Sequence, residues 1–105
     1  MYKVRKREGK IVSFDINKID SAIKKAFDSV DRKYDDNVID FLALKVTADF
    51  EPKLKNNIVS VEDIQDSVEA VLSAAGYGDV AKSYILYRKQ HEKMRNMKST
   101  LLDYK

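Results

Sequence analysis

The clearest structural pattern in the chain lies at residues 4–19, V-R-K-R-E-G-K-I-V-S-F-D-I-N-K-I. Residues 2–7 and 10–14 are rich in β-branched and aromatic side chains, and Glu8-Gly9 lies between them as a two-residue turn, so the spacing predicts a β-hairpin. Asp15 then stands where a helix N-cap is expected, because the apolar residues that follow it recur at helical spacing. The stretch therefore predicts a hairpin that leads directly into a helix.

The middle of the chain predicts a second helix and one more short strand. A polar, aspartate-rich loop over residues 31–37 precedes the helix, which must stop near Pro52 because proline cannot continue a helix. Asn56-Asn57 is predicted to form a turn, and Ile58-Val59 a third short strand.

Two further helices complete the predicted order of elements. Ser60 has the pattern of a helix start, with acidic residues in the turn that follows, and Gly76 has that of a helix end. Asp79 is predicted to cap a last helix that runs to about Met97. This order predicts a small sheet packed against four helices, in the α+β class. Residues 98–105 have no strong pattern and are predicted to be a tail or the start of a further segment.

The composition excludes several classes of function. The 105 residues include no cysteine, which excludes disulfides and thiolate metal sites among them, and the single histidine, His91, disfavours a histidine-based metal site. No apolar run approaches the roughly 20 residues that span a bilayer, and no secretory signal is visible, so we expect no membrane association and a cytoplasmic location. No catalytic constellation is present, so we expect no enzymatic activity from this segment alone.

Positive charge is concentrated near the two ends of the chain. The net charge is only +3, but residues 1–10 and 82–98 are basic and residues 28–40 between them are acidic. This distribution favours a local anion site over a nucleic-acid-coating surface. The competing interpretation is that both basic stretches are solvated faces.

An anion site is predicted where the hairpin meets the first helix. Lys6 and Arg7 lie on the hairpin, and Lys18 lies in the first helical turn, where the helix dipole would favour an acid. Unpaired backbone N–H groups at the same helix end prefer an anion, so a bound phosphate chain would resolve the conflict. The alternative is that these are ordinary exposed cations.

A second signal is Y-I-L-Y-R at residues 84–88. Tyr84, Tyr87 and Arg88 lie on neighbouring turns of the predicted last helix. Aromatic and guanidinium groups can stack on a base or hold a phosphate. Core packing with one arginine extending to solvent is the alternative.

These segments together resemble the ATP-cone domain, which occurs at the N-terminus of many ribonucleotide reductases and in their transcriptional repressor. The matching features are K-R-E-G at 6–9, F-D-I-N-K-I at 14–19, V-E-D-I-Q-D-S-V-E at 61–69 and A-K-S-Y-I-L-Y-R at 81–88. They occur in the family's order and cover about residues 2–92. The resemblance implies a four-helix bundle capped by a small three-stranded sheet, with residues 1–97 as the nucleotide-binding domain.

The last residues point to a particular parent enzyme. Residues 97–105 resemble the stretch that links the cone to the catalytic barrel in anaerobic, class III, glycyl-radical reductases. The resemblance implies a ribonucleoside-triphosphate reductase, with residues 98–105 as the start of a linker to its catalytic domain. The absence of a zinc ribbon counts against the repressor.

The resemblance also implies a ligand and the residues that bind it. The ligand would be ATP or dATP, with magnesium left open, and ATP would activate and dATP inhibit the enzyme. Partners would be the catalytic domain of the same polypeptide and other reductase subunits, through nucleotide-dependent oligomerisation. Phosphates would contact Lys6, Arg7 and Lys18. Adenine would be bordered by Val4, Phe14 and Asp15. Ribose or phosphates would be faced by Val61 and Gln65, and the site would be closed by Lys82, Tyr87 and Arg88.

Two other functions remain open from the sequence. One is the ATP-cone of a nucleotide-responsive repressor, or a related nucleic-acid-binding module that draws on the basic ends, although no separate DNA-reading element is visible. The other is a non-catalytic interaction domain whose pattern reflects only core and surface.

Overall fold

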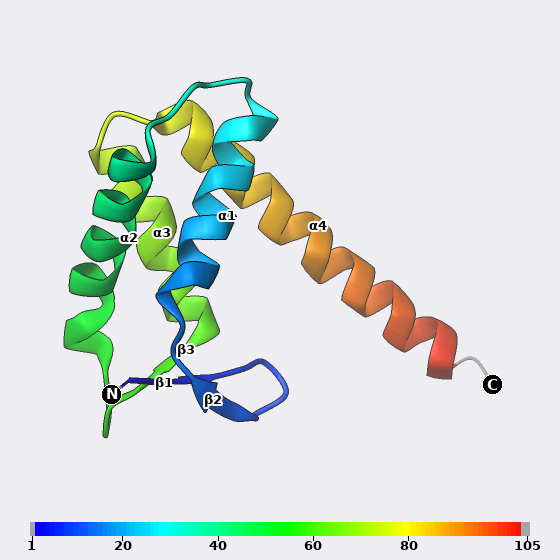
Figure 1. Ribbon diagram of the computed structural model, residues 1–105. Helices are drawn as coiled ribbons and strands as arrows, with labels where there is room; N and C mark the ends of the chain where they lie inside the picture. The colour runs from blue at the N-terminus through cyan, green and yellow to red at the C-terminus, as the bar shows by residue number, and fades with distance from the viewer. Residues whose placement is uncertain (1, 104–105) are drawn as a thin grey trace.

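The computed structural model describes the backbone of residues 2–103 and the side chains of residues 2–94. The described chain is an α+β fold with four α-helices and a three-stranded sheet, as predicted (Figure 1). The elements are β1 (Lys3–Arg5), β2 (Ile11–Ser13), α1 (Ile16–Ser29), α2 (Asp36–Phe50), a 3₁₀ turn (Glu51–Lys53), β3 (Ile58–Ser60), α3 (Val61–Ala74) and α4 (Gly78–Asp103).

The sheet is mixed, with β1 in the centre. Its order is β2-β1-β3, in which β1 pairs antiparallel with β2 and parallel with β3. Val4 lies opposite Val12 on one side and Val59 on the other, and Val4 and Val59 are both buried. The sheet lies across one end of the helices, which places the hairpin beside the starts of α1 and α3 (Figure 1).

The hairpin turn differs from the prediction. The Gly9 N–H donates to the Lys6 carbonyl at 2.9 Å, and the Lys6 N–H donates to the Lys10 carbonyl at 2.8 Å. The turn is therefore centred on Arg7 and Glu8, and Gly9 follows it with a φ of +93°. A two-residue Glu8-Gly9 turn was the wrong prediction, because the glycine occupies the left-handed position after a longer turn.

The predicted helix boundaries are largely confirmed. Asp15 caps α1 by accepting a hydrogen bond from the Asn17 N–H, and Ser60 caps α3 by accepting one from the Asp63 N–H. Gly76 ends α3 with a φ of +90°, and the next residue, Tyr77, donates its N–H to the Leu72 carbonyl.

The last helix departs from the prediction at both ends. It begins at Gly78, so Asp79 lies within its first turn, and the Tyr77 carbonyl accepts the first helical hydrogen bond, from the Ala81 N–H. It continues beyond Met97 to Asp103, so the predicted tail is helical over most of its length.

The core lies among α1, α2 and α3, the sheet and the first turns of α4. The largest buried side chains in it include Phe27, Phe50 and Leu72. The later turns of α4 diverge from the bundle (Figure 1), and Leu86 and Met94 on this helix are exposed. Within the described residues, no helix is long and apolar enough to cross a membrane.

Candidate functional site

Two adjoining cavities lie among the hairpin, α1, α3 and α4. One, of about 520 Å³, lies between α1 and α4, and the other, of about 210 Å³, lies between the hairpin, α1 and α3. Both are lined by Asp15, Lys18, Ala22 and Tyr84. The two cavities therefore form one continuous groove, which we call the α1 groove.

The smaller cavity has an apolar lining with polar groups at its edge. Its walls include Val4 and Phe14 from the hairpin and Val61 from the start of α3. Phe14 packs edge-on against Phe50 and at a tilt against Tyr2. A flat apolar group with polar edges suits such a cavity. The polar side chains of its lining are Lys6, Ser13, Asp15, Lys18 and Gln65.

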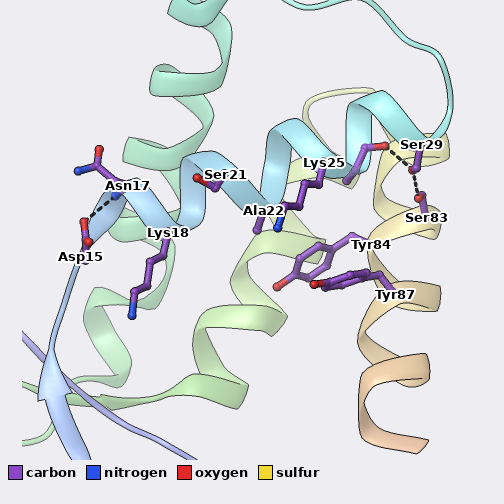
Figure 2. Close-up of a pocket in the computed structure, with 11 residues that line it drawn as sticks. Asp15, Asn17, Lys18, Ser21, Ala22, Lys25, Ser29, Ser83, Tyr84 and Tyr87 are labelled. Atoms are coloured by element: carbon purple, nitrogen blue, oxygen red, sulfur yellow. Dashed lines mark hydrogen bonds between the residues drawn. The ribbon is translucent and has the colours of Figure 1, made fainter. Parts of the chain in front are cut away.

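The larger cavity is lined by cationic and hydroxyl side chains as well as by apolar groups. One face of α1 lines it with Lys18, Ser21, Lys25 and Ser29, which recur every three or four residues and so lie on one side of the helix. Figure 2 shows the ammonium groups of Lys18 and Lys25 on the side of α1 that faces the two tyrosines of α4. Within the part of the chain that the structure describes, no carboxylate lies within 4.0 Å of either ammonium group.

Two tyrosines and a serine of α4 form the opposite wall. The Tyr84 and Tyr87 hydroxyls both point into the space beside α1, and Ser83 shares a hydrogen bond with Ser29 at the far end (Figure 2). Burial raises the pKa of Tyr84 to about 12, against a smaller lowering influence of Arg88. Tyr84 is therefore a neutral hydroxyl at physiological pH, able to donate a hydrogen bond.

Asp15 has two roles at the junction of the cavities. Its Oδ1 accepts the Asn17 N–H at 3.0 Å as the α1 cap, and the side chain also lines both cavities. A carboxylate has a second oxygen, so the cap leaves acceptor capacity for a ligand.

Arg7 lies at the edge of the groove and is already engaged by α3. Its Nη2 donates to Gln65 Oε1 at 3.1 Å, and its Nη1 lies 3.4 Å from Glu62 Oε2. Arg7 lines neither cavity, but Gln65 lines the smaller one, so the guanidinium adjoins the groove through this contact.

Arg88 and Lys82 lie outside the lining of the groove. Arg88 Nη1 donates to Asp66 at 2.8 Å and to Glu69 at 2.9 Å, which joins α4 to α3. Burial alone would lower the pKa of Arg88, but the hydrogen bonds to the two carboxylates more than offset it and the pKa is raised. Lys82 is exposed on α4 and lines neither cavity.

The structure thus brings together most of the predicted site residues. The α1 groove is lined by Val4, Lys6, Phe14, Asp15, Lys18, Val61, Gln65 and Tyr87. Residues that sequence reasoning missed include Ser21, Lys25, Ser29 and Ser83. The first three lie at helical spacing from Lys18, a signal already present in the sequence. No group of three or more histidine, aspartate or glutamate side chains suited to a metal ion occurs in the described residues.

An apolar cavity that opens into one lined by lysines has a shape and charge that suit an anionic ligand with an apolar part. The chain belongs to the ATP cone domain family, whose model matches residues 2–93.

Similar proteins are ribonucleotide reductases. The chain is 42% identical over 99 residues to the vitamin B12-dependent ribonucleoside-diphosphate reductase of Mycobacterium tuberculosis, a match that covers 94% of this chain and 14% of that protein. It is 41% identical to the enzyme of the same name from Thermoplasma acidophilum, over 94% of this chain and 13% of that protein. It is 34% identical to the ribonucleoside-diphosphate reductase subunit alpha of Chlamydia pneumoniae, over 86% and 9%. The chain therefore spans a small part of the length of these relatives.

The relatives do not support the parent enzyme that was expected from residues 97–105. They are named as diphosphate reductases, and two of the three as vitamin B12-dependent. The prediction of an anaerobic, glycyl-radical, triphosphate-reducing parent is therefore unsupported. It was based on a resemblance over only nine residues.

Proposed function

We propose that this domain binds ATP or dATP in the α1 groove and thereby regulates the overall activity of a ribonucleotide reductase. The observation that carries the proposal is the continuity of the groove, in which an apolar cavity bordered by Phe14 opens beside Lys6, Lys18 and Lys25. An adenine nucleotide has the same division into a flat base and a polyanion. Membership of the ATP cone family and the similarity to reductases support the same assignment.

The lining residues suggest how the nucleotide is held. Adenine is expected in the smaller cavity, against Phe14 and Val61, with the second oxygen of Asp15 able to accept a hydrogen bond from the exocyclic amine. Phosphates are expected near Lys6 and Lys18, whose ammonium groups supply charge. Arg88 and Lys82 are expected to contribute less directly, because they lie outside the lining. Magnesium would accompany the phosphates as part of the ligand.

Regulation requires that the two nucleotides act differently. In the proposal ATP favours an active state of the enzyme and dATP an inactive one, although the ligands differ only at the 2′-hydroxyl. Such a difference demands unequal coupling to two states, in addition to binding. The proposed partners are the catalytic part of the same polypeptide and further reductase subunits that assemble in a nucleotide-dependent way, in the cytoplasm.

A lysine substitution tests the site directly. Lys18→Ala is expected to weaken ATP binding in isothermal titration calorimetry by about tenfold, because it removes one charge-assisted contact to phosphate. Lys24→Ala is the matched control, since Lys24 lies on the same helix and pairs with Asp36 away from the groove. Equal affinities for Lys18→Ala and Lys24→Ala, or the absence of saturable ATP binding to the unsubstituted chain, would contradict the proposal.

A further inference from the structure

The carboxylate of Glu62, on α3, is paired with Arg7, a side chain predicted to bind the phosphates of the ligand. Arg7 lies in the middle of the hairpin turn, and its side chain reaches across to the first turns of α3, where Glu62 and Gln65 hold it. The Arg7 and Glu62 side chains are 28% and 41% exposed, so both are open to exchange of partners. Glu62 lies in the first turn of α3, a position where negatively charged side chains stabilise a helix.

The geometry of the Arg7 guanidinium makes its contact with Glu62 compete with phosphate binding. A guanidinium binds a phosphate most strongly through two parallel N–H groups. In the structure Arg7 Nη1 faces Glu62 and Nη2 donates to Gln65, so the edge that carries both terminal nitrogens is taken. A phosphate that enters beside Lys6, the neighbour of Arg7 in the chain, and binds this edge of the guanidinium displaces at least one of these partners. It must also approach the negative charge of Glu62.

We propose that Glu62 competes with the phosphates of the ligand for Arg7. This competition lowers the affinity of the α1 groove for polyphosphate, and it makes the contact between the hairpin turn and α3 depend on whether the groove holds a nucleotide. The inference rests on the proposed function, because it assumes that phosphates bind in this groove. When a phosphate takes Arg7 from Glu62, the turn loses a contact that holds it to α3. Nucleotide occupancy is thereby transmitted to the hairpin.

The size of the effect follows from the exposure of the pair. Partly exposed ion pairs are weak, so removal of the Glu62 charge is expected to strengthen polyphosphate binding by about two- to fivefold. The gain should shrink at high ionic strength, since salt screens both the pair and the repulsion of the ligand.

Glu62→Gln is the decisive variant, because glutamine keeps the size of the side chain and removes its charge. Binding of ATP, inorganic tripolyphosphate and adenosine is measured by calorimetry at low salt. Asp36→Asn is the matched control, since Asp36 is also an acid in a first helical turn, paired with Lys24 at 3.5 Å and outside the groove. Arg7→Gln alone and with Glu62→Gln completes a double-mutant cycle.

The expected result is tighter binding of ATP and tripolyphosphate to Glu62→Gln, no gain for adenosine, no gain for Asp36→Asn, and loss of the gain when Arg7 is also replaced. Equal ATP affinities of the unsubstituted chain and Glu62→Gln would overturn the inference and leave the proposed function standing. A gain that persists without Arg7 would also overturn it. The absence of ATP binding to both proteins would overturn the proposed function and this inference with it.

Discussion

Replacement of Arg88 by glutamine should weaken the fold in the absence of any nucleotide. The side chain is 20% exposed and donates to Asp66 and Glu69, and these two bonds tie α4 to α3. Glutamine is too short and uncharged to keep both contacts, and it leaves two neighbouring carboxylates without their cation. We therefore expect Arg88 to act as a positioning residue that holds α4, which carries Tyr84 and Tyr87, against α3.

The expected loss of stability follows from the exposure of Arg88, Asp66 and Glu69. A hydrogen bond to a charged group contributes roughly 1.5–3 kcal/mol when shielded, whereas an exposed ion pair contributes under about 1 kcal/mol. Asp66 is 53% exposed and Glu69 only 25%, so the Glu69 contact should dominate. We expect Arg88→Gln to lower the free energy of unfolding by about 1–2 kcal/mol. For a domain of this size each kcal/mol corresponds to a fall in Tm of about 4–8 °C.

Urea denaturation followed by far-UV circular dichroism measures this effect. Arg32→Gln is the control, because Arg32 pairs with Asp79 at 2.7 Å but is 41% exposed, and its replacement should lower stability by less than about 1 kcal/mol. Unchanged stability of ligand-free Arg88→Gln, together with lost ATP binding, would refute the positioning role and show that Arg88 binds the nucleotide directly.

Three further predictions concern ionisation and buried polar groups. Burial, together with the neighbouring Asp40 carboxylate, raises the pKa of Asp20, so the ionised form of Asp20 costs stability. Asp20→Asn should therefore raise Tm at pH 7, and the gain should disappear below about pH 3 in pH-dependent melting. Burial raises the pKa of Tyr84 from 10.0 to about 12, so the stability that its neutral hydroxyl contributes is complete below pH 10 and is lost as pH rises towards 12. A phenolate absorbance titration of the folded chain measures this ionisation, and every tyrosine ionising near pH 10 would contradict the prediction. Ser67 is fully buried, and its hydroxyl has no hydrogen-bond partner among the described residues. Ser67→Ala should therefore leave the free energy of unfolding, measured in urea titrations, unchanged or raise it by up to about 1 kcal/mol. A marked loss of stability would reveal a partner for the hydroxyl.

The elements that local chemistry controls were predictable from the sequence. Asp15 and Ser60 cap their helices, and Gly76 ends α3, because each effect depends on residues within one helical turn. The hairpin was predictable but its turn was not, since Gly9 fits both a two-residue turn and the position after a longer one. The end of α4 was missed because residues 98–103 carry no periodic apolar pattern to mark a helix.

The α1 groove was predictable only where its residues lie close together in the chain. Lys6, Phe14, Asp15 and Lys18 are close in the chain, so their gathering follows from the hairpin and the first helical turn. The partners of the two arginines were not visible in the sequence. Arg7 on the hairpin turn meets Glu62 on α3, far along the chain, and Arg88 meets carboxylates some twenty residues away. Which acids lie near a cation is decided by packing between elements.

Two-dimensional ¹⁵N NMR of the chain during titration with ATP tests whether the nucleotide binds in the α1 groove, because the shifted amides locate the ligand on the fold. We expect saturable shifts of the backbone amides of Phe14, Lys18, Gln65 and Tyr84, which line the α1 groove, and little change at Phe41 and Leu44 on the exposed face of α2. Shifts confined to the exposed face of α2, or no saturable shift at the groove, would contradict the claim that the α1 groove binds the nucleotide.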